Sequence, residues 1–237
     1  MTEAVLGADV LRSYEARRTA AREELCPELE NQCEPGAWNP EQFAQQQIRG
    51  LVRQVFFANG SRPVRQLVFS ALEPETDVRI LCLRVGEALS LETTGSVAVV
   101  GRFPRAIHGS APLECGTKQS TPLRQIATRV RGNFWLVPDQ TRASDPVRAT
   151  SVHSFLGEVR SQFDYSIVER PVAGESHQAA FMAQFADGII LVLSALRTRR
   201  AAARKVKETL ESVQAHLLGT VLSDRIFPVP EVIYRRL

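Results

Sequence analysis

Short apolar runs alternate with longer amphipathic segments along most of the chain. The runs typical of strands are centred on residues 66–69, 96–100, 133–137, 165–168, 188–193 and 218–222. The segments that repeat apolar residues at helical spacing are residues 41–57, 78–90, 146–162, 175–186 and 199–217, with a further short helix expected at 122–131. Strands that alternate with helices in this way predict an α/β fold: a doubly wound, mostly parallel sheet with helices on both faces.

The chain divides into two parts at about residue 40. Residues 1–40 are expected to form a peripheral extension, helical at first and then a loop, and residues 41–237 to form one domain. A length of 237 residues suits a single large domain. The last helix is expected to begin after an N-cap at Thr198. Its apolar face would be formed by Val206, Leu210, Val213 and Leu217.

Composition places the chain among ordinary globular proteins. With 44% hydrophobic residues and a net charge of only +3, nucleic acid is not the expected partner. The best apolar stretch, Gly188 to Ala195, is far shorter than the roughly 18–20 residues that span a bilayer, and the N-terminus lacks the pattern of a signal peptide. The four cysteines show no metal-binding spacing, and Cys82 falls in an expected core helix. We therefore expect a soluble protein of the reducing cytoplasm.

Lysine is rare and unevenly placed. The chain has three lysines, Lys118, Lys205 and Lys207, so residues 1–117 contain none. A preference for arginine codons is the simplest explanation. The absence nevertheless excludes any chemistry that needs a lysine ammonium from the first half of the chain, including a Schiff base or an N-terminal phosphate-loop lysine.

Ligands of a doubly wound sheet bind at the carboxyl ends of its strands. The turn after the first expected strand reads Ser70-Ala71-Leu72-Glu73-Pro74-Glu75-Thr76-Asp77-Val78-Arg79 and then enters a helix. A strand, a turn and a helix in this order are the context of a phosphate-binding loop.

From about residue 41 onward, the chain resembles the bacterial tyrosine kinases of capsule and exopolysaccharide synthesis, a branch of the MinD/ParA-like P-loop ATPases. The segments that carry the resemblance are residues 48–57, 65–71, Phe134-Trp135-Leu136-Val137-Pro138, Phe163-Asp164-Tyr165-Ser166-Ile167-Val168-Glu169-Arg170-Pro171, 186–192 and 218–222. The resemblance implies the three-layer fold of P-loop ATPases and a nucleotide site at the loop after the first strand.

The phosphate loop departs from the family at its most important positions. The resemblance aligns the family's Gly-Lys-Ser/Thr with Thr76, Asp77 and Val78, and no glycine occurs from residue 61 to residue 85. A phosphate-loop lysine neutralises the β- and γ-phosphates, and the hydroxyl after it holds Mg²⁺. Asp77 reverses that charge, so nucleotide binding is in doubt.

Other family positions are also altered. The Asp-x-Asp motif after the second strand is missing, since no acid lies between Glu92 and Glu114. Glu169 replaces an aspartate, and Ser223 stands at the place of an asparagine that helps to read adenine. The positions of the degenerate nucleotide site are thus Ser70, Pro74, Thr76, Asp77, Val78, Glu169 and Ser223. The resemblance indicates no catalytic residue and no metal ligand among them.

Two further family features survive only in part. The C-terminal tyrosine cluster is reduced to Tyr234, the one candidate phospho-acceptor. The oligomerisation pattern Glu-x-x-Arg-x-x-Arg is represented by Gln46, Arg49 and Val52. A homo-oligomer through residues 41–57 therefore stays a hypothesis.

Several of these residues also have a purely structural interpretation. Asp77 with Thr76 could cap the helix that begins near Val78. Glu169 could be a relic or a salt-bridge partner of Arg170. The basic run from Arg197 to Lys207 could be a solvated helix face, or a contact to an acidic partner or anionic lipid.

Together these observations favour a catalytically degenerate relative of the tyrosine autokinases, a binding or regulatory module of exopolysaccharide or capsule biosynthesis and export. Its expected partner is the cytoplasmic segment of a membrane chain-length regulator or an active kinase paralogue. No cofactor is expected, with Mg-ATP as the alternative. A divergent ATP-binding tyrosine kinase or ATPase and an architectural oligomer subunit are the alternative functions. The expected location is the cytoplasm, with recruitment to the inner face of the membrane as an option.

Overall fold

The structure is a computed structural model, and it describes residues 40–58, 63–103, 122–140, 149–170, 177–195 and 197–223. The expected extension at 1–40, apart from Pro40, most of the loop at 101–122, and Tyr234 lie outside the described residues. The described residues form a seven-stranded sheet in the order β3-β4-β2-β5-β1-β6-β7. Every neighbouring pair is parallel except β3 with β4. The expected mostly parallel, doubly wound sheet is confirmed.

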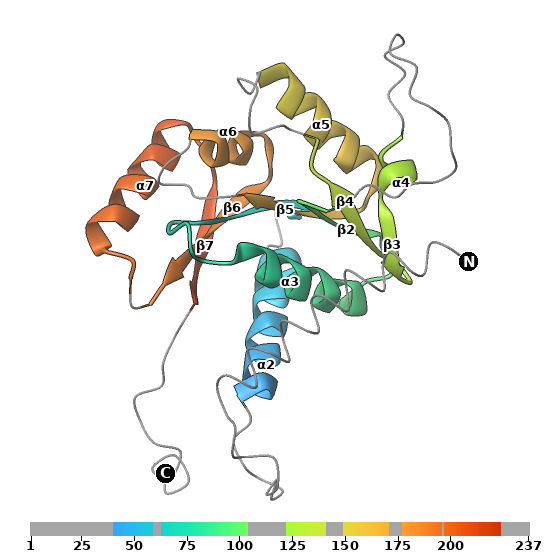
Figure 1. Cartoon of the computed structure of the whole chain (residues 1–237), viewed down its shortest axis with the longest axis horizontal. Helices are drawn as coiled ribbons and strands as arrows, with labels where there is room; N and C mark the ends of the chain where they lie inside the picture. The colour runs from blue at the N-terminus through green and yellow to red at the C-terminus, as the bar shows by residue number, and fades with distance from the viewer. Residues whose placement is uncertain are drawn as a thin grey trace, which may run out of the picture.

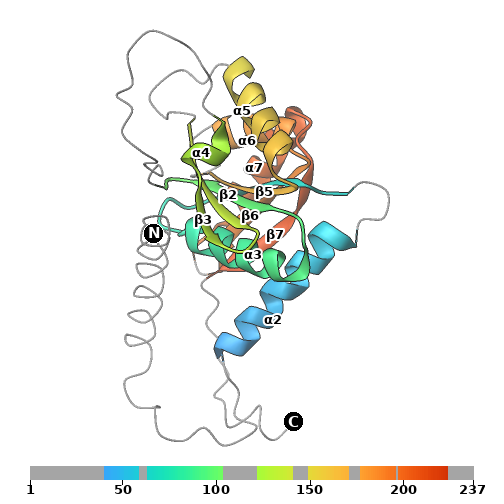
Figure 2. The same ribbon diagram turned by 90° about the vertical axis from the view of Figure 1, so that its right-hand side faces the viewer.

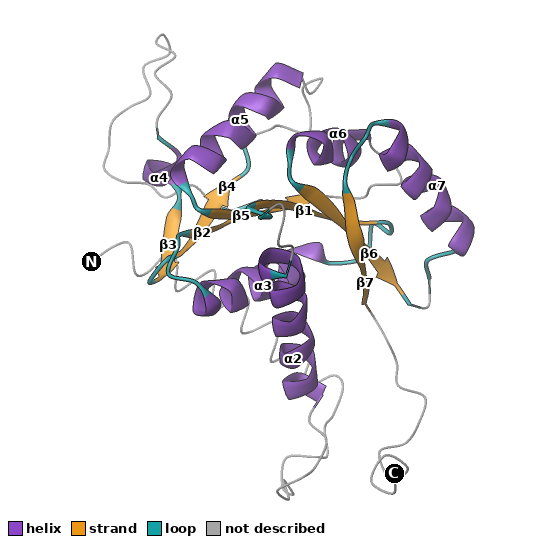
Figure 3. Ribbon diagram, turned by 180° about the vertical axis from the view of Figure 1, so that it is seen from behind, coloured by secondary structure: helices purple, strands orange, loops and turns teal. Residues whose placement is uncertain are grey.

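The strands are β1 (Gln66–Ala71), β2 (Val97–Gly101), β3 (Thr128–Arg131), β4 (Phe134–Pro138), β5 (Tyr165–Arg170), β6 (Gly188–Ser194) and β7 (Leu217–Ser223). The helices are α2 (Pro40–Val52), α3 (Val78–Glu92), α4 (Leu123–Ile126), α5 (Ala149–Gln162), α6 (His177–Phe185) and α7 (Arg200–Ser212), and a π-helical turn, η1 (Arg53–Phe57), follows α2. Helices α4, α5, α6 and α7 cover one face of the sheet, and α3 covers the other (Figures 1 and 3).

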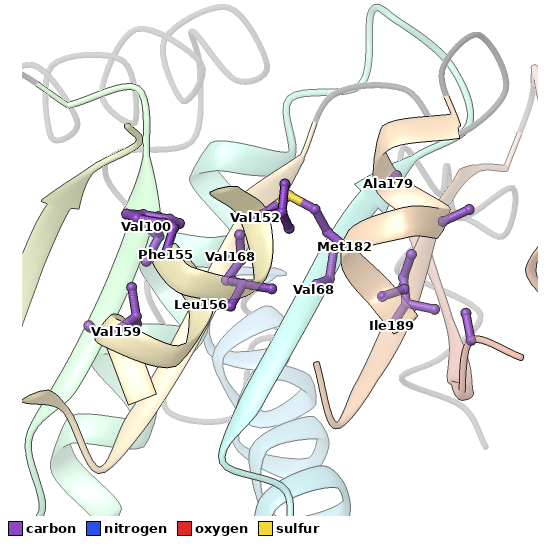
Figure 4. Packing of buried hydrophobic residues seen from close by; sticks show 14 of the residues in the cluster. Val68, Val100, Val152, Phe155, Leu156, Val159, Val168, Ala179, Met182 and Ile189 are labelled. Atoms are coloured by element: carbon purple, nitrogen blue, oxygen red, sulfur yellow. The ribbon is translucent and has the colours of Figure 1, made fainter. Parts of the chain in front are cut away.

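Both faces of the central strands are apolar, which is why these short runs fold as strands. All six residues of β1 and all five of β2 are buried. Val68 and Val100 point to the layer of α5 and α6, where Phe155, Leu156 and Met182 pack against them (Figure 4). The residues next to them in sequence join the second core under α3, as Leu67, Phe69 and Val99 do. The alternation follows from the two-residue period of a strand between two covering layers.

Aspartates fix the amino ends of the strands. The Asp164 carboxylate accepts hydrogen bonds from the N–H and the hydroxyl of Ser96, both at 2.8 Å, and these bonds lower the pKa of Asp164. Asp187 accepts from the N–H groups of Arg65 and Gln66, also at 2.8 Å, and pairs with Arg160. The two carboxylates therefore join the start of β2 to that of β5, and the start of β1 to that of β6.

Three local predictions are wrong. Only residues 123–126 of the expected helix at 122–131 are helical, because Thr128–Arg131 pairs antiparallel with β4 as an edge strand. Thr198 is not an N-cap: Arg199 holds that position without a side-chain bond, and the Thr198 hydroxyl accepts from the N–H of Ser194 at 2.9 Å. Helix α7 ends at Ser212, so Leu217 belongs to β7 instead. Cys82 is buried in α3, as expected.

The contact of α3 with the sheet should be sensitive to a single methyl group at Gly86. A Cβ there would lie 2.5 Å from Val99 Cγ2 and 2.8 Å from Phe134 Cε2. We expect Gly86→Ala to lower the free energy of unfolding by about 1–3 kcal/mol, as overpacking does. Gly157→Ala in α5 is the control, since a Cβ there would meet nothing within 4 Å beyond its own helix; it should gain up to about 1 kcal/mol from helix propensity. Urea denaturation measures the free energy of unfolding of both variants. Equal values for Gly86→Ala and Gly157→Ala would contradict the close packing of α3 against the sheet.

Candidate site at the carboxyl edge of the sheet

The loop between β1 and α3 uses its backbone donors within the protein. The Leu72 N–H donates to the Val192 carbonyl at 3.1 Å, and the Thr76 N–H closes a turn on the Glu73 carbonyl at 3.2 Å. The N–H of Arg79, in the first turn of α3, donates to the Asp77 carboxylate at 3.0 Å. Three donors of the segment that would face a phosphate therefore already have acceptors.

Asp77 is the N-cap of α3. Its backbone is extended, and its carboxylate accepts from the first turn of the helix. This arrangement satisfies an otherwise unpaired donor and places a negative charge at the positive end of the helix dipole. The helix-capping interpretation of Asp77 is confirmed. A carboxylate now occupies the end of α3 that, in a phosphate loop, receives the anion.

Glu169 lies beside Asp77 and pairs with Arg79. Strand β5 is the neighbour of β1, with Glu169 in register with Phe69. Glu169 Oε2 lies 3.5 Å from Arg79 Nε, and both atoms are buried without a hydrogen-bond partner. Burial raises the pKa of Glu169; the Arg79 and Arg102 guanidinium groups oppose the rise, whereas Asp77 adds to it. The alternative in which Glu169 pairs with Arg170 is not observed, because Glu169 pairs with Arg79 and Arg170 with Asp139.

Arg170 forms a second buried ion pair with Asp139. Its two terminal nitrogens lie 2.9 Å and 3.2 Å from the two carboxylate oxygens of Asp139. The two side chains are only 6% and 14% exposed, so the pair is almost fully removed from water. Burial lowers the pKa of Arg170, and Asp139 opposes that change. This pair was not predicted from the sequence, although Asp139 directly follows β4 and Arg170 ends β5.

The absence of a side chain at Gly101 leaves room for the Glu169 carboxylate. The second strand ends at Gly101, and a Cβ at that position would fall on Glu169 Oε2 and 3.1 Å from the ring of Phe103. The carbonyl of Gly101 also accepts from the N–H groups of Phe103 and Asp139. The end of β2 thus contributes close backbone packing where the family has its acidic motif.

The remaining predicted positions lie along the same edge. Ser70 and Val78 are buried, Thr76 is half-buried, and Pro74 is exposed. Ser223 ends β7 and donates to the Leu193 carbonyl at 3.2 Å. Its strand is two places from β1, roughly 10 Å away at the usual strand spacing. The structure therefore gathers Asp77 and Glu169 with Arg79, and leaves Ser223 apart.

One more ion pair crosses this edge. Arg197, after β6, pairs with the Glu75 carboxylate of the loop, and both side chains are exposed. Among the described residues, no group of three or more His, Cys, Asp or Glu side chains could hold a metal ion.

Comparisons with known proteins fit this architecture. No family model matches the chain. Over 71 residues it is 37% identical to the tyrosine-protein kinase CpsD of Streptococcus agalactiae serotype III, a match over 30% of this chain and 31% of the relative. The match thus spans about a third of the length of that relative.

Solved structures extend the likeness to most of the chain. The kinase domain of the Escherichia coli tyrosine kinase ETK superposes with a TM-score of 0.61 at 12% identity, over 79% of each chain. The VpsO kinase domain superposes with a TM-score of 0.56 at 16% identity, over 79% of this chain and 98% of that one. The fold is that of bacterial tyrosine kinase domains. The MinD cell division protein of Aquifex aeolicus shares it, with a TM-score of 0.54 at 16% identity over 73% of each chain.

The resemblance to bacterial tyrosine kinases and MinD-like ATPases is therefore confirmed. The lysine of the phosphate loop is absent in any alignment of this region, because residues 1–117 contain none. At this edge the chain carries a capping aspartate, a buried Arg170–Asp139 ion pair and a half-buried Arg79–Glu169 ion pair.

The packing of Gly101 against Glu169 can be tested with a double-mutant cycle. We expect Gly101→Ala to displace the Glu169 carboxylate from Arg79 and to lower the free energy of unfolding by about 1–3 kcal/mol. The same change in a Glu169→Ala background should cost less, because the obstructing carboxylate is gone. Denaturant unfolding of the four proteins gives the coupling energy. A coupling energy near zero would show that Gly101 and Glu169 are independent.

The raised pKa of Glu169 predicts a pH dependence. A carboxyl whose pKa rises on folding destabilises the ionised native state, so its contribution to stability falls as pH rises above the ordinary value of 4.5. We expect Glu169→Gln to gain stability relative to the wild-type protein as pH rises through this range. The comparison needs thermal melts of both proteins from about pH 4 to pH 8. A difference that is constant, or that shrinks with rising pH, would contradict the raised pKa.

Proposed function

We propose that the protein is a catalytically degenerate relative of the bacterial tyrosine kinases that acts as a binding or regulatory module in exopolysaccharide or capsule biosynthesis and export. The observation that carries the proposal is the Asp77 carboxylate at the N-terminus of α3. The likeness to CpsD supports the choice of pathway.

The groups at the loop do not suit a nucleotide phosphate. Two like charges about 4 Å apart repel by roughly 4 kcal/mol at an effective dielectric constant of 20. Asp77 would oppose a phosphate in this way, and residues 1–117 contain no lysine that could offset it. Arg79 and Arg170 could supply positive charge, but each already faces a carboxylate of the protein itself. We therefore assign no phosphoryl transfer and no Mg²⁺ site to this edge.

The proposed module binds partners through its surface. Helix α2 extends away from the two layers and touches the body at α3 (Figures 1 and 2). The adjoining turn η1 is held by the Arg53–Glu92 ion pair and leaves Phe57 about half exposed. Val52, Val55 and Phe56 are buried in this chain, so a homo-oligomer through residues 41–57 would use the exposed side chains of this segment. The proposed external partner is the cytoplasmic segment of a membrane chain-length regulator or an active kinase paralogue. The proposed location is the cytoplasm, and such a partner would bring the protein to the inner face of the membrane.

A divergent ATP-binding tyrosine kinase or ATPase is the second candidate. It is favoured by the arginines at the edge, since guanidinium groups bind phosphate well. Arg102 is exposed next to Glu169, and Arg197 forms only an exposed pair with Glu75. In this alternative the arginines would exchange their carboxylate partners for the phosphates of Mg-ATP.

Titration with Mg-ATP and Mg-ADP separates the two candidates. We expect no calorimetric binding signal and no thermal shift at millimolar nucleotide. A micromolar dissociation constant would overturn the proposal; at a hundredfold excess of nucleotide over that constant, binding stabilises a protein by about 2.7 kcal/mol. For a domain of this size such stabilisation raises the melting temperature by about 5–10 °C.

A charge-neutral variant makes the test specific to the loop. Asp77→Asn retains a good helix N-cap, because asparagine caps about as well as aspartate. If the carboxylate is what opposes phosphate, Asp77→Asn combined with Glu169→Gln should bind nucleotide more tightly than the wild-type protein. The control is the double variant Glu87→Gln/Glu92→Gln, which removes two carboxylates toward the other end of α3. It should leave the affinity for nucleotide unchanged. If the wild-type protein and both double variants bind nucleotide with equal affinity, the Asp77 carboxylate is not what opposes nucleotide binding.

A further inference from the structure

Helix α7 presents a dense basic surface that the proposed function does not use. Six cations occur between residues 197 and 207, and the first acid after them is Glu208. We define the α7 basic surface by its four exposed members Arg199, Arg200, Arg204 and Lys205. These four span roughly 9 Å along the helix at the usual rise per residue.

The charges of this surface are not neutralised by the part of the protein that the structure describes. Within the run, Arg197 pairs with Glu75, and Lys207 lies 3.4 Å from Glu211. No carboxylate of the described residues forms an ion pair with any of the four residues of the α7 basic surface. Helix α6, which packs beside α7, carries no Asp, Glu, Lys or Arg. The surface is therefore a net positive patch on a nearly neutral layer of helices.

The order of charges along α7 does not serve helix stability. Basic residues cluster at the N-terminal end, where the helix dipole is positive, and Glu208 and Glu211 follow in the C-terminal half. The opposite order would stabilise the helix. The N-cap residue Arg199 also makes no side-chain hydrogen bond to the first turn. Packing of Val206 and Leu210 against the core holds the helix in place despite this arrangement.

The composition of the surface favours a diffuse anionic partner. Between Arg199 and Lys207 the exposed residues other than the cations are Ala201 and Ala202. A protein interface needs a core with large apolar or aromatic anchors, and these are missing. Single-stranded nucleic acid is bound with aromatic side chains on which bases stack, and α7 has none. Clusters of four to eight basic residues on an amphipathic helix are typical of proteins that bind anionic lipids.

We propose that the α7 basic surface docks on the anionic headgroups of a lipid bilayer. Helix α7 lies at the outer end of the helix layer (Figures 1 and 3), so a flat surface can approach it. No helix of the described residues is long and apolar enough to cross a bilayer, and docking by charge alone needs none. Each basic residue near an anionic membrane strengthens binding roughly fivefold. The surface thus gives weak, reversible attachment, which does not depend on nucleotide binding.

Co-sedimentation with lipid vesicles tests the proposal on the full chain. The probes are vesicles of phosphatidylcholine alone and of equal parts phosphatidylcholine and phosphatidylglycerol. We expect binding to the anionic vesicles only, and release near 1 M salt, where the screening length is about 3 Å. Arg200→Gln/Arg204→Gln/Lys205→Gln should bind roughly a hundredfold more weakly, since three charges are removed.

A matched control removes three charges elsewhere. Arg65, Arg124 and Arg131 are exposed and lie outside α7, and their triple change to Gln should bind almost like the wild-type protein. Equal weakening in both variants would overturn the proposal, because net charge and not the α7 basic surface would then govern binding. Equal binding to neutral vesicles, or no vesicle binding alongside binding to a polyglutamate peptide, would also overturn it. The α7 variant should melt no lower than the wild-type protein, because the lost cations opposed the helix dipole.

Discussion

A sheet that is covered on both faces restricts charged side chains to the ends of its strands. Strands β1 and β2 are buried along their whole length, and the two core clusters leave no solvent on either side of them. A charge in the middle of such a strand would lose its hydration without a partner, at a cost that folding cannot offset. The polar chemistry of the molecule therefore gathers at the two edges where strands begin and end.

The two edges use their charges differently. At the amino edge, Asp164 and Asp187 accept hydrogen bonds from backbone and hydroxyl donors and hold the starts of neighbouring strands together. At the carboxyl edge, where ligands of such sheets bind, the carboxylates of Glu169 and Asp139 face arginines of the protein itself. The buried pair of Arg170 and Asp139 must remain complete, because removing one partner leaves an uncompensated charge, whereas about a third of the Arg79 side chain opposite Glu169 is exposed. A phosphate bound at this edge would have to replace the Glu169 and Asp139 carboxylates as the partner of these arginines.

The central strands could be predicted from the sequence, because long apolar runs leave few alternatives for a buried parallel sheet. Strand β3 could not, because its sequence Thr128-Arg129-Val130-Arg131 contains a single apolar residue. That strand exists because the Gly132 turn, with a positive φ, returns the chain beside β4, and Arg129 lies over the Trp135 ring. The Asp77 cap was predictable because it is local. The pairs Arg79–Glu169 and Arg170–Asp139 were not, since they join residues far apart in sequence through strand order.

The ion-paired arginines of the sheet edge and the lysines of α7 occupy different environments in this protein. Arginine has a planar group that can satisfy several acceptors at once, which suits the ion pairs of Arg170 and Arg79. Two of the three lysines, Lys205 and Lys207, instead lie on the exposed side of α7. Lysine is a strongly hydrated point charge on a flexible stem, suited to a solvated surface. A codon preference would explain arginine throughout, but not an aspartate at residue 77, where the family's resemblance places a cation. The carboxylate there caps α3 and contributes to the raised pKa of Glu169, so the charge reversal at residue 77 is part of the structure of this edge.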